Sequence, residues 1–205
     1  MVTGLPGSVL AVFAHPDDAE LWAGGTLAHH AAHAPVTVAV AHHSPQRDAE
    51  AAAGARVLGT LLHQADALDV PALHQLLMDL RPDVVITHPL RDVHPDHRRV
   101  AGTVLAALPE PVIATGHPRR VYTCDTYNSL TLDGPLTADT IVDVTATFHT
   151  KIAALREHAS QPIDDHFGPM AEHLGRLWGA RIGTPYAEAF TAVPVLGRLP
   201  GATQL

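Results

Sequence analysis

The stretch SVLAVFAHPDDAE, residues 8–20, decides the fold of this 205-residue chain. Residues 8–14 form an apolar run, which is typical of a strand buried on both faces of a parallel sheet. The motif His15-Pro16-Asp17-Asp18 begins where that strand would end. In open α/β sheets, ligands bind at the carboxyl ends of the strands. The stretch therefore predicts a central strand and, directly after it, the polar groups of a binding site.

The rest of the chain alternates between helical and strand patterns. We expect further strands over residues 36–41, 83–87 and 141–144, and helices over residues 21–34, 48–58, 71–80, 95–108, 147–159 and 172–182. In the first half this order predicts a doubly wound, Rossmann-like α/β domain with a mainly parallel sheet flanked by helices. No repeat or linker divides the sequence, so we expect a single domain over residues 1–205.

Composition limits the classes of partner. The 21 acidic residues outnumber the 13 Lys and Arg residues, and the formal net charge is −8. Nucleic acids and anionic membranes reward clustered positive charge, so we expect neither as a partner and expect a small-molecule substrate instead. The single cysteine, Cys124, excludes an intramolecular disulfide. With no secretory signal or apolar span recognisable, we expect a cytoplasmic protein; homo-oligomerisation stays open.

Two motifs rich in histidine and aspartate carry the chemistry. The second, His94-Pro95-Asp96-His97, follows the strand expected at residues 83–87 and opens a helix, where His94 and His97 share one face. Together the motifs offer imidazoles and carboxylates without a thiolate. Two His and one Asp with an open fourth position form a catalytic zinc arrangement, although Fe²⁺ also suits such ligands.

The adjacent carboxylates of Asp17 and Asp18 can hold different roles, because neighbouring side chains in a turn point in different directions. One can bind the metal while the other takes a proton from a metal-activated water. Each motif alone could also be a turn followed by a helix cap. Both motifs together, each after a buried strand, favour the metal site.

At this point the sequence resembles the PIG-L/LmbE-like family of zinc-dependent N-acetylglucosaminyl deacetylases. The two histidine motifs and Gly24-Gly25-Thr26 carry the resemblance. It extends to Arg47, Glu50 and residues 57–59 in the second helix. It also extends to residues 142–145, Lys151, Ala154-Leu155, His158, Ser160-Gln161 and residues 186–190.

The resemblance implies roles for the matched residues. His15, Asp18 and His97 would bind one Zn²⁺ per chain, and Asp17 would be the general base. His94 would stabilise the oxyanion or protonate the leaving amine. Asp96 would orient a histidine, and Glu20 would cap a helix or support the site. The candidate substrate contacts are Arg47, His43, His88 and His158.

The implied activity is removal of an acyl group, in this family an acetyl group, from the amide nitrogen of an amino sugar or a sugar-containing metabolite. Members of the family often carry Thr-x-Gly after the second strand, where this chain has Ala41-His42-His43-Ser44-Pro45. This departure leaves open a zinc amidase with a non-sugar or antibiotic-intermediate substrate. A catalytically silent metal- or ligand-binding protein is the alternative from another class, although binding alone needs neither Asp17 nor His94.

Overall fold

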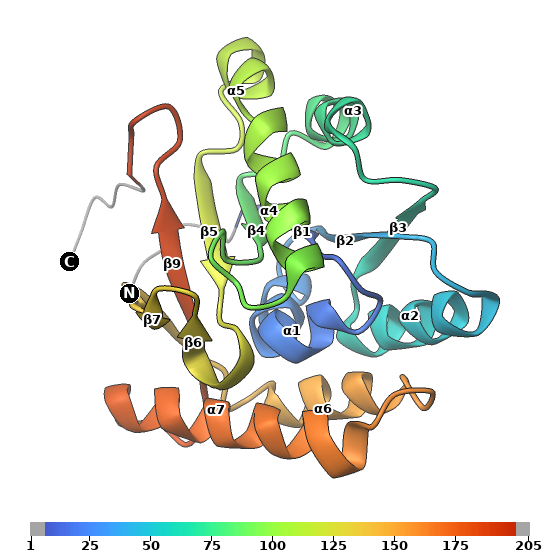
Figure 1. The fold of residues 1–205 in the computed structure, drawn as a ribbon, viewed down its shortest axis with the longest axis vertical. Helices are drawn as coiled ribbons and strands as arrows, with labels where there is room; N and C mark the ends of the chain where they lie inside the picture. Colours follow the sequence, from blue (N-terminus) through green and yellow to red (C-terminus); the bar gives the residue numbers. More distant parts are fainter. Residues whose placement is uncertain (1–6, 200–205) are drawn as a thin grey trace.

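Seven strands form one sheet at the centre of residues 7–199, the part of the chain that the computed structural model describes (Figure 1). The strand order is β3-β2-β1-β4-β5-β9-β8. The first five are parallel, whereas β9 is antiparallel to both of its neighbours. Their bounds are β1 (Val9–Val12), β2 (Val36–Ala41), β3 (Leu61–Ala65), β4 (Val84–Thr87), β5 (Arg120–Cys124), β8 (Thr140–Asp143) and β9 (Ala187–Val193). A small hairpin pairs β6 (Leu130–Thr131) with β7 (Gly134–Pro135).

Helices cover both faces of the sheet. One layer contains α1 (Asp18–Ala31), α2 (Pro45–Leu58), α6 (Phe148–Arg156) and α7 (Gly168–Ile182). The other contains α3 (Val70–Leu80), α4 (Pro95–Ala107) and α5 (Pro109–Thr115). Within the described residues, no helix combines the length and the apolarity that a bilayer crossing needs.

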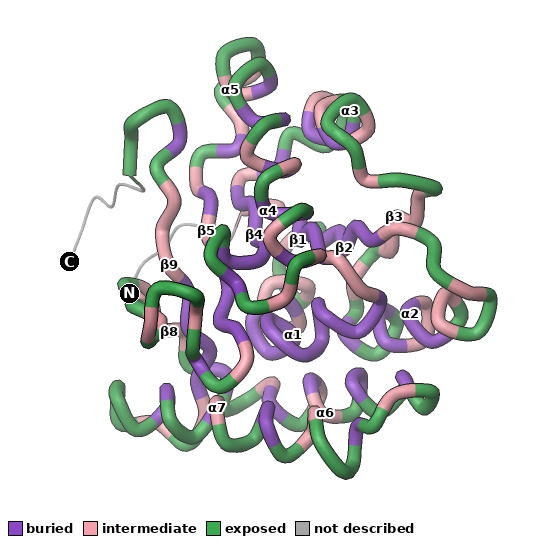
Figure 2. Tube along the Cα trace, viewed as in Figure 1, coloured by how far each residue is buried: buried purple, intermediate pink, exposed green. Residues whose placement is uncertain are grey.

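The apolar run of β1 is buried on both faces, as its composition predicts. Val9 and Ala11 pack into a core with α1, whereas Leu10 and Val12 pack into a second core with α3 and α4. Figure 2 shows the central strands buried and the outer sides of the surrounding helices exposed. Alternate side chains of β1 point to opposite faces of the sheet. Because both faces are covered, all of these side chains must be apolar.

The doubly wound α/β class predicted from the sequence is confirmed, but three strands of the seven-stranded sheet and both strands of the small hairpin are absent from that prediction. The strand β3 is an edge strand with partly exposed side chains, so it lacks the apolar run that marks β1 and β4. The strands β5 and β9 pair with each other although they lie far apart in the chain. Such pairing depends on tertiary contacts that a local pattern does not contain.

Several helix boundaries also differ from the prediction. The first helix begins at Asp18, within the first motif, and the second begins at Pro45. The Ser44 hydroxyl accepts a hydrogen bond from the Arg47 backbone N–H at 3.3 Å and so caps the second helix. Gly59 ends that helix with φ of 76°, a left-handed conformation that favours glycine. The last helix begins at Gly168.

The chain changes direction across the sheet between β1 and β4. From β1 it proceeds outward to β2 and β3 on one side, and from β4 it proceeds to β5 on the other. Neighbouring strands with opposite onward directions leave a crevice at their carboxyl ends, which is where doubly wound proteins bind ligands. The first motif follows β1 and the second follows β4, so both lie at this crevice.

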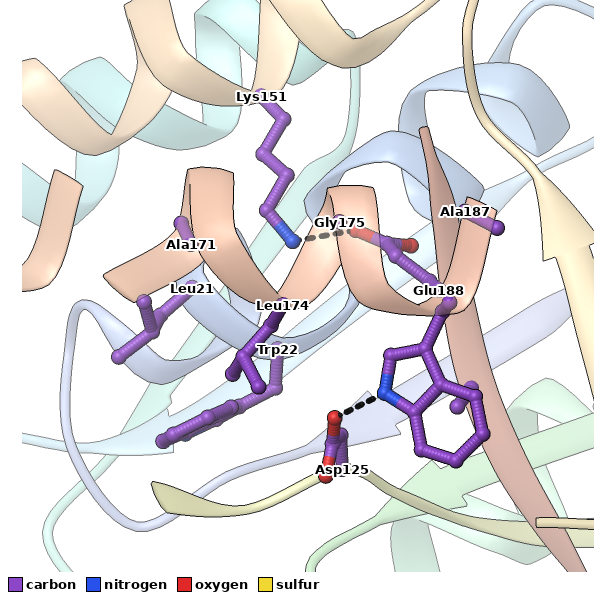
Figure 3. Close-up of a pocket in the computed structure, with 11 residues that line it drawn as sticks. Leu21, Trp22, Asp125, Lys151, Ala171, Leu174, Gly175, Ala187 and Glu188 are labelled. Carbon is purple, nitrogen blue, oxygen red and sulfur yellow. Dashed lines mark hydrogen bonds and ion pairs between the residues drawn. The ribbon is translucent and has the colours of Figure 1, made fainter. Parts of the chain in front are cut away.

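A buried ion pair between α6 and β9 lies against the first helix, α1. The Lys151 ammonium on α6 lies 2.6 Å from a carboxylate oxygen of Glu188 on β9 (Figure 3). The same carboxylate accepts hydrogen bonds from the backbone N–H groups of Gly25 at 3.0 Å and Thr26 at 2.8 Å. The Lys151 side chain also passes 3.1 Å from the point where a Cβ on Gly24 would lie. The glycines of α1 therefore let α6 and β9 close against the helix that begins in the first motif.

We predict that Lys151→Met lowers the free energy of unfolding by about 3–5 kcal/mol, because it leaves the buried Glu188 charge without its partner. Chemical denaturation of the variant measures this loss. The control is Arg156→Met on the same helix, which removes an exposed ion pair with Asp164 and should leave the unfolding midpoint nearly unchanged. Equal midpoints for the two variants would contradict the role given to Lys151.

Candidate metal centre and active site

Three side chains predicted as metal ligands converge on one point. His15 Nδ1 lies 3.1 Å from Asp18 Oδ2 and 3.3 Å from His97 Nε2, and His97 Nε2 lies 3.4 Å from Asp18 Oδ1. Tetrahedral zinc with ligands at its usual bond lengths places ligand atoms about 3.4 Å apart. The spacing and the donor types therefore fit a single divalent metal ion.

The turn after β1 prepares Asp18 for this position. The His15 backbone N–H donates to Asp18 Oδ2 at 2.7 Å, and the Trp22 indole N–H donates to Asp18 Oδ1 at 3.1 Å. Burial alone would raise the pKa of Asp18, but the nearby His88 and the hydrogen bonds from His15, His88 and His97 outweigh it and hold the pKa well below its usual range. A carboxylate that stays ionised while buried is suited to a cation.

Asp92 orients His97 through the ring nitrogen that does not face the ligand cluster. Its Oδ2 lies 3.1 Å from His97 Nδ1, and both residues are fully buried. Its Oδ1 accepts a hydrogen bond from the His94 backbone N–H at 2.7 Å. A carboxylate on one ring nitrogen fixes the tautomer and directs the other nitrogen toward the metal. Asp92 is not among the site residues predicted from the sequence; its signal is a carboxylate two residues before the second motif, in the loop that follows β4.

The same carboxylates set the charge of His97. Burial lowers the pKa of His97, but its hydrogen bonds to Asp18 and Asp92 outweigh burial and raise the pKa to about 9. The protein therefore favours a positive charge at this ring. A metal ion held by His97 Nε2 would take the place of the proton, because imidazole binds metals through an unprotonated nitrogen.

His94 caps the helix α4 and faces the same centre. Its Nδ1 accepts a hydrogen bond from the Asp96 backbone N–H at 3.2 Å, so the neutral ring carries its proton on Nε2. Burial and the neighbouring His97 and His15 lower the pKa of His94, which favours this neutral form. The His94, His15 and His97 rings each place a nitrogen within 4.8 Å of the others, so a three-histidine ligand set is also geometrically open.

Asp17 is paired with a cation on α2. The Arg47 guanidinium donates to Asp17 Oδ1 at 2.6 Å, and Asp17 is buried. Burial and the charge of Asp18 raise the pKa of Asp17, while Arg47 partly offsets them. A carboxyl whose pKa is raised accepts protons more readily near neutral pH, as a general base requires.

Supporting residues surround these groups. Asp96 Oδ2 lies 3.5 Å from His15 Nε2, so Asp96 faces the outer nitrogen of a predicted ligand. Glu20 lies 3.5 Å from His158 Nε2, with both side chains buried. Gly54 on α2 makes room for this pair, because a Cβ there would overlap the Glu20 carboxylate.

The four predicted substrate contacts lie in different surroundings. Arg47 is at the site beside Asp17, and His43 is exposed, with its backbone N–H donating to Asp48 Oδ1 at 2.9 Å. His88 is fully buried, accepts a hydrogen bond from the Ala14 N–H at 3.1 Å and stacks on His97 at 3.8 Å. His158 is also fully buried. Substrate contact by these four residues stays a prediction.

The family model PIG-L, described as GlcNAc-PI de-N-acetylase, matches residues 10–108. The resemblance to the PIG-L family is thereby confirmed over this segment. It begins in β1 and ends just after α4, so it contains both histidine motifs, Asp92 and Arg47. A comparison with curated proteins finds no match.

Solved structures share the fold over most of the chain. The 4-carboxy-2-hydroxymuconate hydratase GalB from Pseudomonas putida is 21% identical, with a TM-score of 0.76 and coverage of 98% of this chain and 99% of that one. The conserved protein TT1542 from Thermus thermophilus is 26% identical, with a TM-score of 0.77 and coverage of 96% and 99%. An N,N'-diacetylchitobiose deacetylase from Pyrococcus horikoshii is 22% identical, with a TM-score of 0.70 and coverage of 92% and 84%. At these identities, the hydratase and the deacetylase establish a shared fold only.

We predict that Asp92→Asn weakens Zn²⁺ binding by roughly 10–100-fold, because His97 loses the charged partner that orients it. Competition with a fluorescent chelator measures the dissociation constant. Asp133→Asn, which changes an exposed aspartate paired with Arg91, is the matched control and should bind Zn²⁺ like the wild type. An unchanged dissociation constant in Asp92→Asn would remove Asp92 from the metal centre.

Proposed function

We propose that this protein is a zinc-dependent hydrolase that removes an acyl group, most simply acetyl, from the amide nitrogen of an amino sugar or a sugar-containing small metabolite. The observation that carries the proposal is the cluster of His15 Nδ1, the two oxygens of Asp18 and His97 Nε2, with pairwise distances of 3.1–3.4 Å. Asp17 directly precedes Asp18 in the chain, and a His94 ring nitrogen lies within 4.8 Å of nitrogens of His15 and His97. The family match over residues 10–108 supports a hydrolase of the deacetylase type.

The types of donor atom favour zinc as the metal, and the surroundings of Asp18 and His94 favour Asp18 as the third ligand. Two imidazoles and one carboxylate leave a fourth position open, as in catalytic zinc sites. Asp18 is a better third ligand than His94, because its buried negative charge needs a cation nearby and the His94 ring already accepts a backbone hydrogen bond. Fe²⁺ could occupy the same ligands.

The reaction divides between two side chains. When bound, zinc supplies a Lewis acid that polarises the amide carbonyl and makes a water more acidic. Asp17 takes the proton of the attacking water, with Arg47 holding the carboxylate through Oδ1. The His94 Nε2–H donates a hydrogen bond to the carbonyl oxygen as negative charge develops there. The proton then passes from Asp17 to the leaving amine nitrogen, and the acyl group departs as a carboxylate.

Two classes of substrate, amino sugars and non-sugar amides, are compatible with the site. In the loop after β2, the His42 ring lies 3.0 Å from Asp48 and the His43 backbone also bonds to Asp48. This loop differs from the pattern usual in the family, so a non-sugar amide is the second candidate. The deacetylase similar in structure acts on a diacetylated chitobiose, which favours testing N-acetyl sugars first.

A substrate panel separates the two candidates. The zinc-loaded protein is incubated with N-acetylglucosamine conjugates and with N-acetylated compounds that contain no sugar, and the free amine is measured with and without EDTA. Chelator-sensitive release from the sugars supports the proposal, and release from the non-sugar amides alone supports the second candidate. Full zinc occupancy without release from either group would favour the silent binding protein.

We predict that Asp17→Asn keeps the metal but lowers kcat by roughly 10²–10⁴-fold, because the amide cannot take a proton from water. Zinc content and amine release are measured on the same sample. The control is Asp79→Asn, an exposed residue on α3, which should retain wild-type activity. Wild-type kcat in Asp17→Asn would exclude this residue as the base.

A further inference from the structure

Tyr127 reaches the metal centre from outside the segment that matches the family. It lies in a short helical turn after β5, at residues Tyr127–Ser129. Its ring is parallel to the His97 ring, with centroids 5.9 Å apart and an interplanar angle of 13°. It meets Trp22 edge-on with centroids 5.1 Å apart. Two residues of the centre, a predicted ligand and the donor to Asp18, therefore contact the phenol ring.

We propose that Tyr127 is a substrate-contacting residue of this site, whose hydroxyl donates a hydrogen bond to the acyl amide of the bound substrate. The assignment rests on the hydrolase function proposed above. It adds a residue that neither of the two histidine motifs contains.

The exposure of the side chain supports this role. Tyr127 is only partly buried, although its ring packs against a predicted ligand and against Trp22. A phenol that lies beside the ligand cluster and is partly exposed is available to a substrate.

The Asp125 carboxylate stabilises the turn that contains Tyr127. Asp125 Oδ2 accepts a hydrogen bond from the Trp178 indole N–H at 2.6 Å (Figure 3). It accepts a second one from the Ser129 hydroxyl at 2.9 Å. Asp125 Oδ1 accepts one from the Thr126 backbone N–H at 2.8 Å. Asn128 and Ser129 both have positive φ, 52° and 54°, so these contacts hold a conformation that the residues would not favour alone. Asp125 thus acts as a clamp on the turn.

Packing leaves little room for the clamp to shift. The cavity between Trp22, Asp125 and Trp178 has a volume of about 10 Å³, close to the space of one water. Because the turn is fixed by both hydrogen bonds and packing, the phenol keeps its place beside His97.

The contact is expected on the acyl amide because the reacting bond must lie at the ligand cluster, where Tyr127 also lies. A contact with the sugar would affect sugar substrates alone. A contact with the amide affects every acylated substrate to a similar degree, and this difference can be measured.

The test is Tyr127→Phe, which removes the hydroxyl and keeps the ring on His97. We expect kcat/KM to fall about tenfold, the effect of one substrate hydrogen bond, for sugar and non-sugar acetyl amides that the wild type hydrolyses, with zinc affinity unchanged. The matched control is Tyr122→Phe on β5, whose ring contacts Phe190 instead of the metal centre and which should keep wild-type activity.

A second variant tests the clamp. Ser129→Ala removes one hydrogen bond to Asp125 and should lower kcat/KM by a smaller factor. In the double variant with Tyr127→Phe it should add no further loss, because Ser129 acts through Tyr127. Additive losses would show a merely structural role for Ser129.

The outcomes separate this assignment from the function on which it rests. Wild-type kcat/KM in Tyr127→Phe, or a loss explained by weaker zinc binding, overturns the assignment and leaves the hydrolase intact. A loss confined to sugar substrates overturns the contact with the amide. A wild-type zinc protein that releases no amine from any amide overturns the proposed function, and this assignment with it.

Discussion

The carboxylate of Asp18 is buried and ionised, and the rest of the site depends on keeping that charge compensated. A buried charge without partners would cost several kcal/mol, so the surrounding groups are constrained to face it. The indole of Trp22, the backbone and ring of His15 and the ring of His97 do so. These contacts fix the turn after β1, the first turn of α1 and the start of α4 relative to one another. The two histidine motifs therefore form one centre because a single carboxylate lies between them.

The second half of the chain holds this centre in place, although the family match ends at residue 108. Glu188, paired with Lys151, accepts hydrogen bonds from the backbone of α1. Asp125 and Trp178 hold the turn that carries Tyr127. In our proposal the first half thus supplies the metal ligands and the base, whereas the second supplies the supports and a contact with the substrate. This division explains why the motifs alone predict a type of chemistry but not the substrate.

The sequence predicts the parts of the molecule that have local signals. The apolar run of residues 8–14 is visible because β1 is buried on both faces, and the spacing in His94-Pro95-Asp96-His97 suits the first turn of a helix. The edge strand β3 has no comparable pattern. Tyr127 comes to the site only because β5 lies beside β4, so its role depends on tertiary structure. The Asp92 carboxylate lies close to the second motif, yet its function follows only from the direction of the His97 ring.

Anomalous diffraction at the zinc absorption edge, from crystals of the zinc-loaded protein, tests the central claim most directly. The account predicts one strong peak per chain, about 2.0–2.2 Å from His15 Nδ1, an Asp18 oxygen and His97 Nε2, with His94 outside bonding distance. A peak bound to His94 with Asp18 outside the coordination sphere would contradict the ligand assignment. No peak at this position would contradict the metal centre itself.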